Sequence, residues 1–283
     1  MCSFFKRFSI ITFKRKRSKS EVDSSQSITA PNTGSTITVQ LSDLVITVTA
    51  MGKQALPELE EISKFLFHVN DGTRKDCVVA VTLNSSLRCR SNAEFFVTFA
   101  HGRHRDYQIG QLLQIHSYNE LESYEATVKF ISLQFDFVIL KSNSTLEEGP
   151  ELDFSPKFGE SIMINGYGND LKCLSYCEGN IFIQEKMNFF NDDEIIGPFF
   201  LGTISTYYGD SGAGVWSSNG LAGVNLGFTN KVFEEAAHFT MHNYFVGISR
   251  IYSAIEYVND IESMHTNKAT YFSMDGDGRA RSI

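Results

Sequence analysis

Short apolar runs, rich in β-branched and aromatic residues, recur along the chain and are separated by turn residues. Runs of about four to eight residues bounded by Gly, Asn, Asp and Ser are typical of β-strands. The expected strands lie at 37–39, 44–48, 78–83, 94–99, 107–115, 126–133, 135–140, 161–164, 180–183, 199–204, 215–216, 221–226 and 244–248. Strands at this spacing predict an all-β sandwich or barrel architecture.

Two segments show helical spacing instead of alternation. Residues 58–66 have apolar positions three or four apart, and so do residues 248–261; both patterns predict helices. Polar residues dominate 18–36, and 142–157 contains two prolines and a glycine, so both stretches are typical of linkers. The pattern therefore predicts four parts, namely a disordered arm (1–36), a first β domain (37–145), a second β domain with a closing helix (146–262) and a flexible tail (263–283).

Composition makes the chain globular and its charge uneven. Of the 283 residues, 42% are hydrophobic, which is enough for a sizeable core. Residues 1–20 carry seven Lys and Arg and no acid, whereas the remainder carries 18 Lys and Arg against 33 Asp and Glu. The acidic body is therefore not expected to bind nucleic acid.

The N-terminal arm does not have the pattern of a secretory signal peptide. Lys6 and Arg7 interrupt its apolar residues, and a second basic run follows at 14–17. Three interpretations stay open: a solvated tail, a membrane-surface or lipidated arm using Cys2, and a nuclear or mitochondrial address. No run approaches 18 apolar residues, so no membrane span is expected. We expect an intracellular protein, with the cytoplasm favoured and the nucleus possible.

The cysteines also favour a reducing compartment. There are five of them, at 2, 77, 89, 173 and 177. An odd number without a signal peptide predicts free thiols. The pair at 173 and 177 has no further His or Cys at zinc-like spacing, and a bridge between 77 and 89 across a hairpin has no other support. We expect no metal and no cofactor.

A small-residue turn, Gly209–Gly214, carries the candidate chemistry. It holds one acid, Asp210, and one hydroxyl, Ser211, between glycines. Glycine allows positive φ and close approach of another chain, and such a turn can expose a hydroxyl beside converging backbone N–H groups. The alternative is an ordinary hairpin turn, which uses the same residues.

Six segments, taken in order, resemble the chymotrypsin-like serine proteases. Residues 98–101 match the family's histidine segment, 136–140 its aspartate strand and 165–168 its Gly-Trp-Gly turn. Residues 209–212 match its Gly-Asp-Ser-Gly nucleophile motif, 219–227 the hairpin that follows, and 245–249 its closing strand before a helix. Each motif is modest alone, but the ordered set spans about residues 75–262. The resemblance implies two six-stranded antiparallel β-barrels, with His101 and Asp136 in the first and Ser211 in the second.

The resemblance also assigns roles. Ser211 would be the nucleophile, His101 the base and Asp136 the group that orients the imidazole. The backbone N–H groups of Gly209 and Ser211 would form the oxyanion hole. His104 is the nearest competing histidine, but the Thr-Phe-Ala residues before His101 select the latter. An aspartate between two phenylalanines would be a costly buried charge without a partner. This cost favours Asp136 as the group that pairs with the imidazole.

The chain departs from the family pattern at three places. Gly102 and Tyr207 stand where many members have half-cystines, in keeping with an intracellular protein. The Arg/Lys-Ile/Val-x-Gly-Gly activation site of secreted members is absent from the sequence. In those members a freed N-terminus pairs with the acid that matches Asp210, so Asp210 needs another partner here, or the site forms without cleavage.

Specificity and an alternative function follow from the same comparison. Ser205 would lie at the base of the S1 pocket, with Gly227 and Gly247 on its walls. Since no acid stands at 205, the expected peptide substrate has a large apolar P1 residue. The insertion 228–243 could cover this pocket. The alternative is a catalytically silent domain that binds a protein ligand, with the basic arm providing the targeting.

Overall fold

The computed structural model describes residues 10–15, 36–41, 44–49, 55–70, 75–82, 93–146, 148–168, 174–191, 194–229 and 242–270. Three of the cysteines, Cys2, Cys89 and Cys173, lie outside these residues. So do most of the predicted arm, most of the 228–243 insertion and the end of the predicted tail. The chain divides into two compact units, Met1–Ala55 and Leu56–Ile283.

The first unit contains a small antiparallel sheet. Strands β1 (Ile10–Arg15), β2 (Thr36–Leu41) and β3 (Leu44–Thr49) pair in the order β1-β3-β2. The sequence assigned 1–36 to a disordered arm and placed 37–48 in the first barrel. In the structure these strands pair with one another instead. Only two residues separate β2 from β3, and so short a connection favours an antiparallel hairpin between neighbours.

The first barrel begins only at Leu66. It closes in the order β4-β5-β6-β9-β8-β7. Its strands are β4 (Leu66–Asn70), β5 (Lys75–Val81), β6 (Ala93–Phe99), β7 (Leu112–Ser117), β8 (Ser123–Ser132) and β9 (Phe137–Leu146). A short helix, α1 (Leu59–Ser63), precedes it, and the 3₁₀ helix η1 (Gly102–Asp106) follows β6. The strand predicted at 107–115 is observed as β7 and begins only at Leu112.

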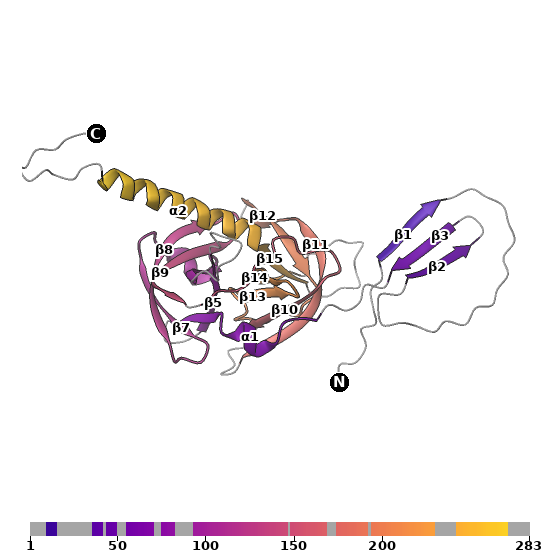
Figure 1. Cartoon of the computed structure of the whole chain (residues 1–283), viewed down its shortest axis with the longest axis horizontal. Helices are drawn as coiled ribbons and strands as arrows, with labels where there is room; N and C mark the ends of the chain where they lie inside the picture. Colours follow the sequence, from indigo (N-terminus) through magenta and orange to yellow (C-terminus); the bar gives the residue numbers. More distant parts are fainter. Residues whose placement is uncertain are drawn as a thin grey trace, which may run out of the picture. The chain divides into compact units, whose positions relative to one another are not determined.

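The second barrel has the same design. It closes in the order β10-β11-β12-β15-β14-β13. Its strands are β10 (Ser161–Gly166), β11 (Ser175–Asn191), β12 (Glu194–Gly202), β13 (Gly214–Ser217), β14 (Gly220–Thr229) and β15 (His242–Gly247). The expectation of two six-stranded antiparallel barrels with a C-terminal helix is therefore confirmed (Figure 1).

Helix α2 (Ile248–Thr270) joins the two barrels. Ile248, Ile251, Ile255 and Val258 are buried, at the helical spacing seen in the sequence. The helix packs on β14, β15 and β8, and at its far end Glu262 forms ion pairs with two lysines of the first barrel, at 2.8 and 2.7 Å. None of the described helices is long and apolar enough to cross a membrane.

Phenylalanines fill the barrel interiors. Six of the largest side chains that are fully buried are phenylalanines, at 67, 95, 96, 137, 199 and 245. Where the barrels meet, Phe65 stacks on Trp216 with ring centroids 5.9 Å apart. Burial of a large apolar side chain contributes roughly 1.5–3 kcal/mol. The core therefore holds the two barrels together and fixes the loops between them.

Candidate active site

Asp136 and His101 come together where β6 ends and its neighbour β9 begins. Asp136 directly precedes β9 and has a φ of 53°, a left-handed conformation rare outside glycine. Its carboxylate Oδ2 lies 2.7 Å from Nδ1 of His101, and Oδ1 accepts a bond of 3.2 Å from the amide of Ala100. An ionised carboxylate can only accept hydrogen bonds, so Nδ1 of His101 carries the proton. In the neutral ring, Nε2 then keeps a free lone pair.

His101 is held at the start of η1 and stays accessible. It has an extended backbone, with φ −78° and ψ 179°, and is the residue before the 3₁₀ helix. Its ring packs on Phe99 with centroids 4.5 Å apart. The imidazole is 37% exposed, whereas the Asp136 side chain is only 10% exposed. A buried acid thus orients a histidine whose free face is open to solvent.

The turn Gly209–Gly214, called the nucleophile loop after the family motif that it resembles, needs its glycines. Gly209 and Gly212 have φ values of 102° and 86°. A Cβ at Gly212 would lie 2.0 Å from the carbonyl oxygen of Cys77, and one at Gly209 would lie 2.8 Å from that of Tyr167. No side chain fits at either position without moving the backbone of a neighbouring segment. Both glycines are therefore required by close approach as well as by φ.

The hydroxyl of Ser211 does not point to the histidine in this structure. Its Oγ donates a 3.0 Å hydrogen bond to the carbonyl oxygen of Leu226. Across the described part of the chain, no hydrogen bond joins Ser211 to His101. Within the same residues, the amides of Gly209 and Ser211 donate to no protein acceptor. The structure thus brings His101 and Asp136 together and leaves Ser211 bonded elsewhere.

Asp210 has polar partners, and no cation pairs with it among the residues that the structure describes. Its carboxylate accepts bonds from the amide of Tyr207 at 2.9 Å and from the hydroxyl of Ser175 at 3.2 Å. Gly166 and Gly168 lie against it, where a Cβ would come within 2.6 and 2.8 Å of Oδ1. Burial raises the pKa of this carboxyl above its ordinary value, while the bonds from Tyr207, Ser175 and Gly168 oppose the rise. The open question of its partner is answered by neutral donors.

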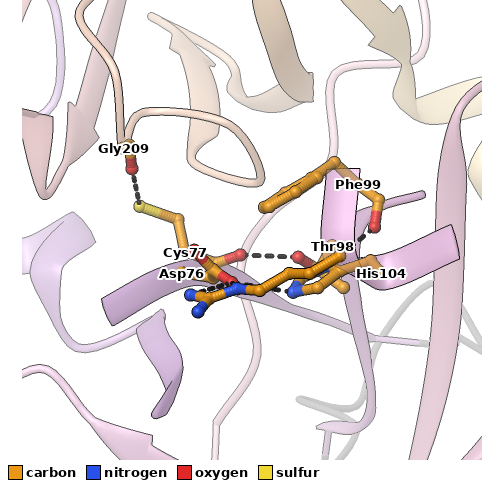
Figure 2. A network of polar contacts seen from close by, with 7 residues as sticks. Asp76, Cys77, Thr98, Phe99, His104 and Gly209 are labelled. Carbon is orange, nitrogen blue, oxygen red and sulfur yellow. Dashed lines mark hydrogen bonds and ion pairs between the residues drawn. The ribbon is translucent and has the colours of Figure 1, made fainter. Parts of the chain in front are cut away.

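A polar network ties β5 to the histidine loop and to the nucleophile loop (Figure 2). Asp76 forms an ion pair with Arg103 and lies 2.9 Å from Nε2 of His104. The His104 ring is fully buried and its Nδ1 lies 2.9 Å from the carbonyl of Phe99. The next residue, Cys77, donates its thiol to the carbonyl of Gly209 at 3.1 Å. His104, the competing histidine of the sequence, is therefore a buried structural residue.

Of the expected S1 residues, Gly227 and Gly247 lie at different points along the β14–β15 pair. Gly227 adjoins Leu226, next to Ser211, and Ser205 is exposed. Gly247 pairs with Gly223 and borders the Phe200 ring. Gly223 and Gly227 are four positions apart on β14, roughly 13 Å along the strand.

The residue opposite Gly227 in the register is Tyr244, which the sequence reasoning missed. A Cβ on Gly227 would lie 3.2 Å from the Tyr244 ring. Burial raises the pKa of Tyr244 to about 12, with the charge of Asp136 adding to the rise. The signal that could have found it is its place in the closing strand, where a large aromatic residue follows directly on the insertion.

Cys77 and Cys177 are free thiols. Within the residues that the structure describes, no three His, Cys, Asp or Glu side chains gather as metal ligands.

Comparison with known proteins gives a fold but no sequence family. No protein-family model and no curated protein matches the chain. Among solved structures, a serine-to-alanine variant of Rv3671c from M. tuberculosis H37Rv, in an inactive form, matches with a TM-score of 0.53 and 12% identity over 73% of this chain and 92% of that one. The MamO protease domain from Magnetospirillum magneticum matches with a TM-score of 0.52 and 11% identity over 68% and 96%.

At such identities the likeness concerns the fold. It agrees with the two closed six-stranded barrels and the C-terminal helix of the structure. The chain is a strongly divergent protein with the double β-barrel fold of the chymotrypsin-like serine proteases.

Proposed function

We propose that this protein is a serine endopeptidase that cleaves peptide bonds through an acyl-enzyme formed on Ser211. The observation that carries the proposal is the 2.7 Å contact between the buried Asp136 and the accessible His101. A carboxylate that orients an exposed imidazole is the arrangement a general base needs. The protease-like fold and the glycine-bounded turn around Ser211 support it.

In the proposed reaction, the Ser211 hydroxyl first leaves the Leu226 carbonyl and turns toward Nε2 of His101. His101 takes the hydroxyl proton as Oγ attacks the peptide carbonyl, and later gives that proton to the leaving amine. Asp136 stabilises the imidazolium that forms in between. The amides of Gly209 and Ser211 would receive the developing oxyanion, and loss of one such donor costs about 3–4 kcal/mol in the transition state.

For specificity we propose an apolar P1 residue. Gly227, beside the Ser211 partner Leu226, faces the ring of Tyr244 rather than a charged group. The ring offers an apolar surface and narrows the space that Gly227 leaves. A panel of fluorogenic peptides that differ only at P1 tests this: cleavage after Leu, Met or Phe is expected, and cleavage confined to Lys or Arg would contradict it.

One observation favours a second function. Because the Ser211 hydroxyl donates to Leu226 and not to His101, the site as observed lacks the nucleophile–base bond. A domain locked in this state would be catalytically silent and would serve to bind a protein ligand. The two candidates differ in whether Ser211 reacts.

A fluorophosphonate probe separates them, because it reacts with a serine hydroxyl that a general base activates. We expect the wild-type protein to be labelled, and both Ser211→Ala and His101→Ala to lose labelling. Ser253→Ala serves as the control, since Ser253 is exposed on α2 and bonds only to its own helix. A wild-type protein that folds but does not react would favour the silent domain, and labelling that survives Ser211→Ala would refute the assignment.

A further inference from the structure

Two consecutive carbonyl groups of the nucleophile loop are held by buried side chains, one from each barrel. The thiol of Cys77, on β5, donates to the carbonyl of Gly209 at 3.1 Å. The side-chain amide of Asn225, on β14, donates to the carbonyl of Asp210 at 3.0 Å. Both residues are fully buried. The proposed mechanism uses neither.

Cys77 is suited to act as a fixed donor. Burial raises the pKa of its thiol well above the ordinary value, with the charge of Asp210 adding to the rise, so it stays protonated at neutral pH. Its own carbonyl accepts a 2.8 Å bond from the hydroxyl of Thr98 and lies where a Cβ on Gly212 would clash. Figure 2 shows the thiol pointing to Gly209, away from the Asp76 and His104 contacts of the same strand.

The amide of Asn225 can face only one way. Its oxygen accepts from the side-chain amide of Asn243 at 3.4 Å, and the oxygen of Asn243 accepts from the backbone amide of Ile204 at 3.3 Å. Since a backbone N–H is always a donor, this chain of bonds fixes which end of each amide is nitrogen. The nitrogen of Asn225 must then point to Asp210.

Holding these carbonyls also aims the N–H groups of the same peptides. A trans peptide places its N–H opposite its C=O. With the Asp210 carbonyl turned toward Asn225, the N–H of Ser211 is turned away from the barrel interior. In the preceding peptide, the Gly209 carbonyl meets Cys77 while the N–H of Asp210 donates to Tyr207 at 3.1 Å. Both peptide planes after Gly209 are thus set from two sides.

We propose that Cys77 and Asn225 are positioning residues that keep the Ser211 N–H aimed at the developing oxyanion. This inference rests on the proposed function. It assigns a task to two buried polar groups that interrupt apolar strands, where a hydrophobic residue would avoid the cost of burying a polar group. It also explains how the loop keeps its shape while neutral donors hold the Asp210 carboxylate.

The test measures the inactivation of the full-length protein by a fluorophosphonate, with the maximal rate constant kinact and the half-saturation concentration KI determined separately. Cys77→Ala and Cys77→Val remove the donor with different buried volumes, whereas Cys77→Ser keeps a donor. Asn225→Leu removes the amide at similar volume. Val79→Ala on β5 and Asn165→Leu on β10 are the matched controls, because both alter buried side chains that make no hydrogen bond to residues 209–211, and the Asn165 side-chain amide donates to Ser63 instead.

We expect kinact to fall roughly 10-fold in Cys77→Ala, Cys77→Val and Asn225→Leu, as loss of one hydrogen bond of about 1.4 kcal/mol implies. KI should stay within about twofold, because the oxyanion forms only in the transition state. Cys77→Ser should recover most of the rate, because it keeps a donor. The controls should lower the melting temperature without changing kinact.

Wild-type kinact in folded Cys77→Val and Asn225→Leu would overturn the inference while leaving the proposed function intact. A fall of the same size in Val79→Ala and Asn165→Leu would overturn it too, since the effect would then be general loss of packing. A wild-type protein that never reacts would instead refute the proposed function, and the positioning role with it.

Discussion

At the scale of single residues, Asp136 and Asp210 are two buried acids in different surroundings. Asp136 sits at a φ of 53° with an imidazole and a backbone amide on its oxygens. A non-glycine residue in this region costs of order 1–3 kcal/mol and persists where its surroundings hold it. Asp210 has backbone and hydroxyl donors on its carboxylate, and among the described residues no cation pairs with it. Each environment leads to its own prediction.

Replacing Asp136 with Asn should leave the loop in place and disable the base. The amide can donate to His101, which favours the tautomer with the proton on Nε2, and that nitrogen then cannot accept the Ser211 proton. By analogy with such triads, fluorophosphonate inactivation should slow by roughly 10⁴-fold. Asp153→Asn is the matched control, because Asp153 is also buried but bonds Ser217 and Ser155 instead. Equal rates for Asp136→Asn and wild type would contradict the role.

Asp210 should make stability depend on pH in a defined direction. Its pKa in the folded state is raised above the ordinary value of 3.8, chiefly by burial. At pH values between the unfolded and the folded pKa, the folded state therefore binds more protons than the unfolded state. Stability contributed by this group is therefore present at low pH and is lost as pH rises through the folded pKa. The free energy of unfolding of wild type, minus that of Asp210→Asn, should fall from pH 4 upward and then level off. Urea denaturation at a series of pH values measures it, and a rise with pH would contradict the assignment.

At the scale of elements, β5 connects the loop that follows His101 to the loop that contains Ser211. Asp76 holds Arg103 and His104 of η1, and Cys77 holds the nucleophile loop (Figure 2). The ring of His104 is stacked between Phe99 and Tyr107, with centroids 4.1 and 4.5 Å away. The polar contacts and the stacking together fix the 3₁₀ helix that begins directly after His101.

Asp76→Asn should therefore loosen the histidine loop. It removes the charge that faces Arg103 and His104, and breaking a largely buried pair destabilises a protein by about 3 kcal/mol, less where one partner is partly exposed. The Arg103 side chain is 34% exposed, so we expect about 2 kcal/mol in urea denaturation. Lys64→Gln, at an exposed ion pair with Glu148, should change stability much less. Equal losses in the two variants would show that the β5 contact is no more than a surface pair.

Sequence patterns predicted most elements of the barrels, and they failed where long-range contacts decide. The alternation and turn residues located the strands next to which His101, Asp136 and Ser211 lie, and the periodicity from Ile248 located α2. Strands β2 and β3 have the same local pattern as barrel strands, so only their pairing with β1 separates them. Tyr244 was missed because strand register, which sets it opposite Gly227, is not visible in composition. Asn225 did leave a signal, as a polar residue in the apolar run 221–226.

At the scale of the whole molecule, both barrels and α2 belong to one compact unit, Leu56–Ile283. The three-stranded sheet β1-β3-β2 belongs to the other unit. Each barrel closes on its own strands, so no strand of the first unit is needed to complete either. The candidate catalytic residues all lie in the second unit.

Removal of residues 1–54 should therefore leave the second unit folded. We expect the shortened protein to melt within about 2–4 °C of the full chain, the shift that about 1 kcal/mol produces in a domain of this size. Its rate of reaction with the fluorophosphonate should be unchanged within about twofold, since it keeps every residue that the mechanism uses. Calorimetry and the labelling rate measure both. An unfolded or unreactive product would show that the first unit contributes to the site.

The central claim is that Ser211 is an activated nucleophile, and mass spectrometry of the phosphonylated protein tests it most directly. We predict a single adduct per chain, on the peptide that contains Ser211, which forms in the wild-type protein and is absent from Ser211→Ala and Asp136→Asn after the same exposure. An adduct on another residue, or a folded wild-type protein that gains no mass, would contradict the claim.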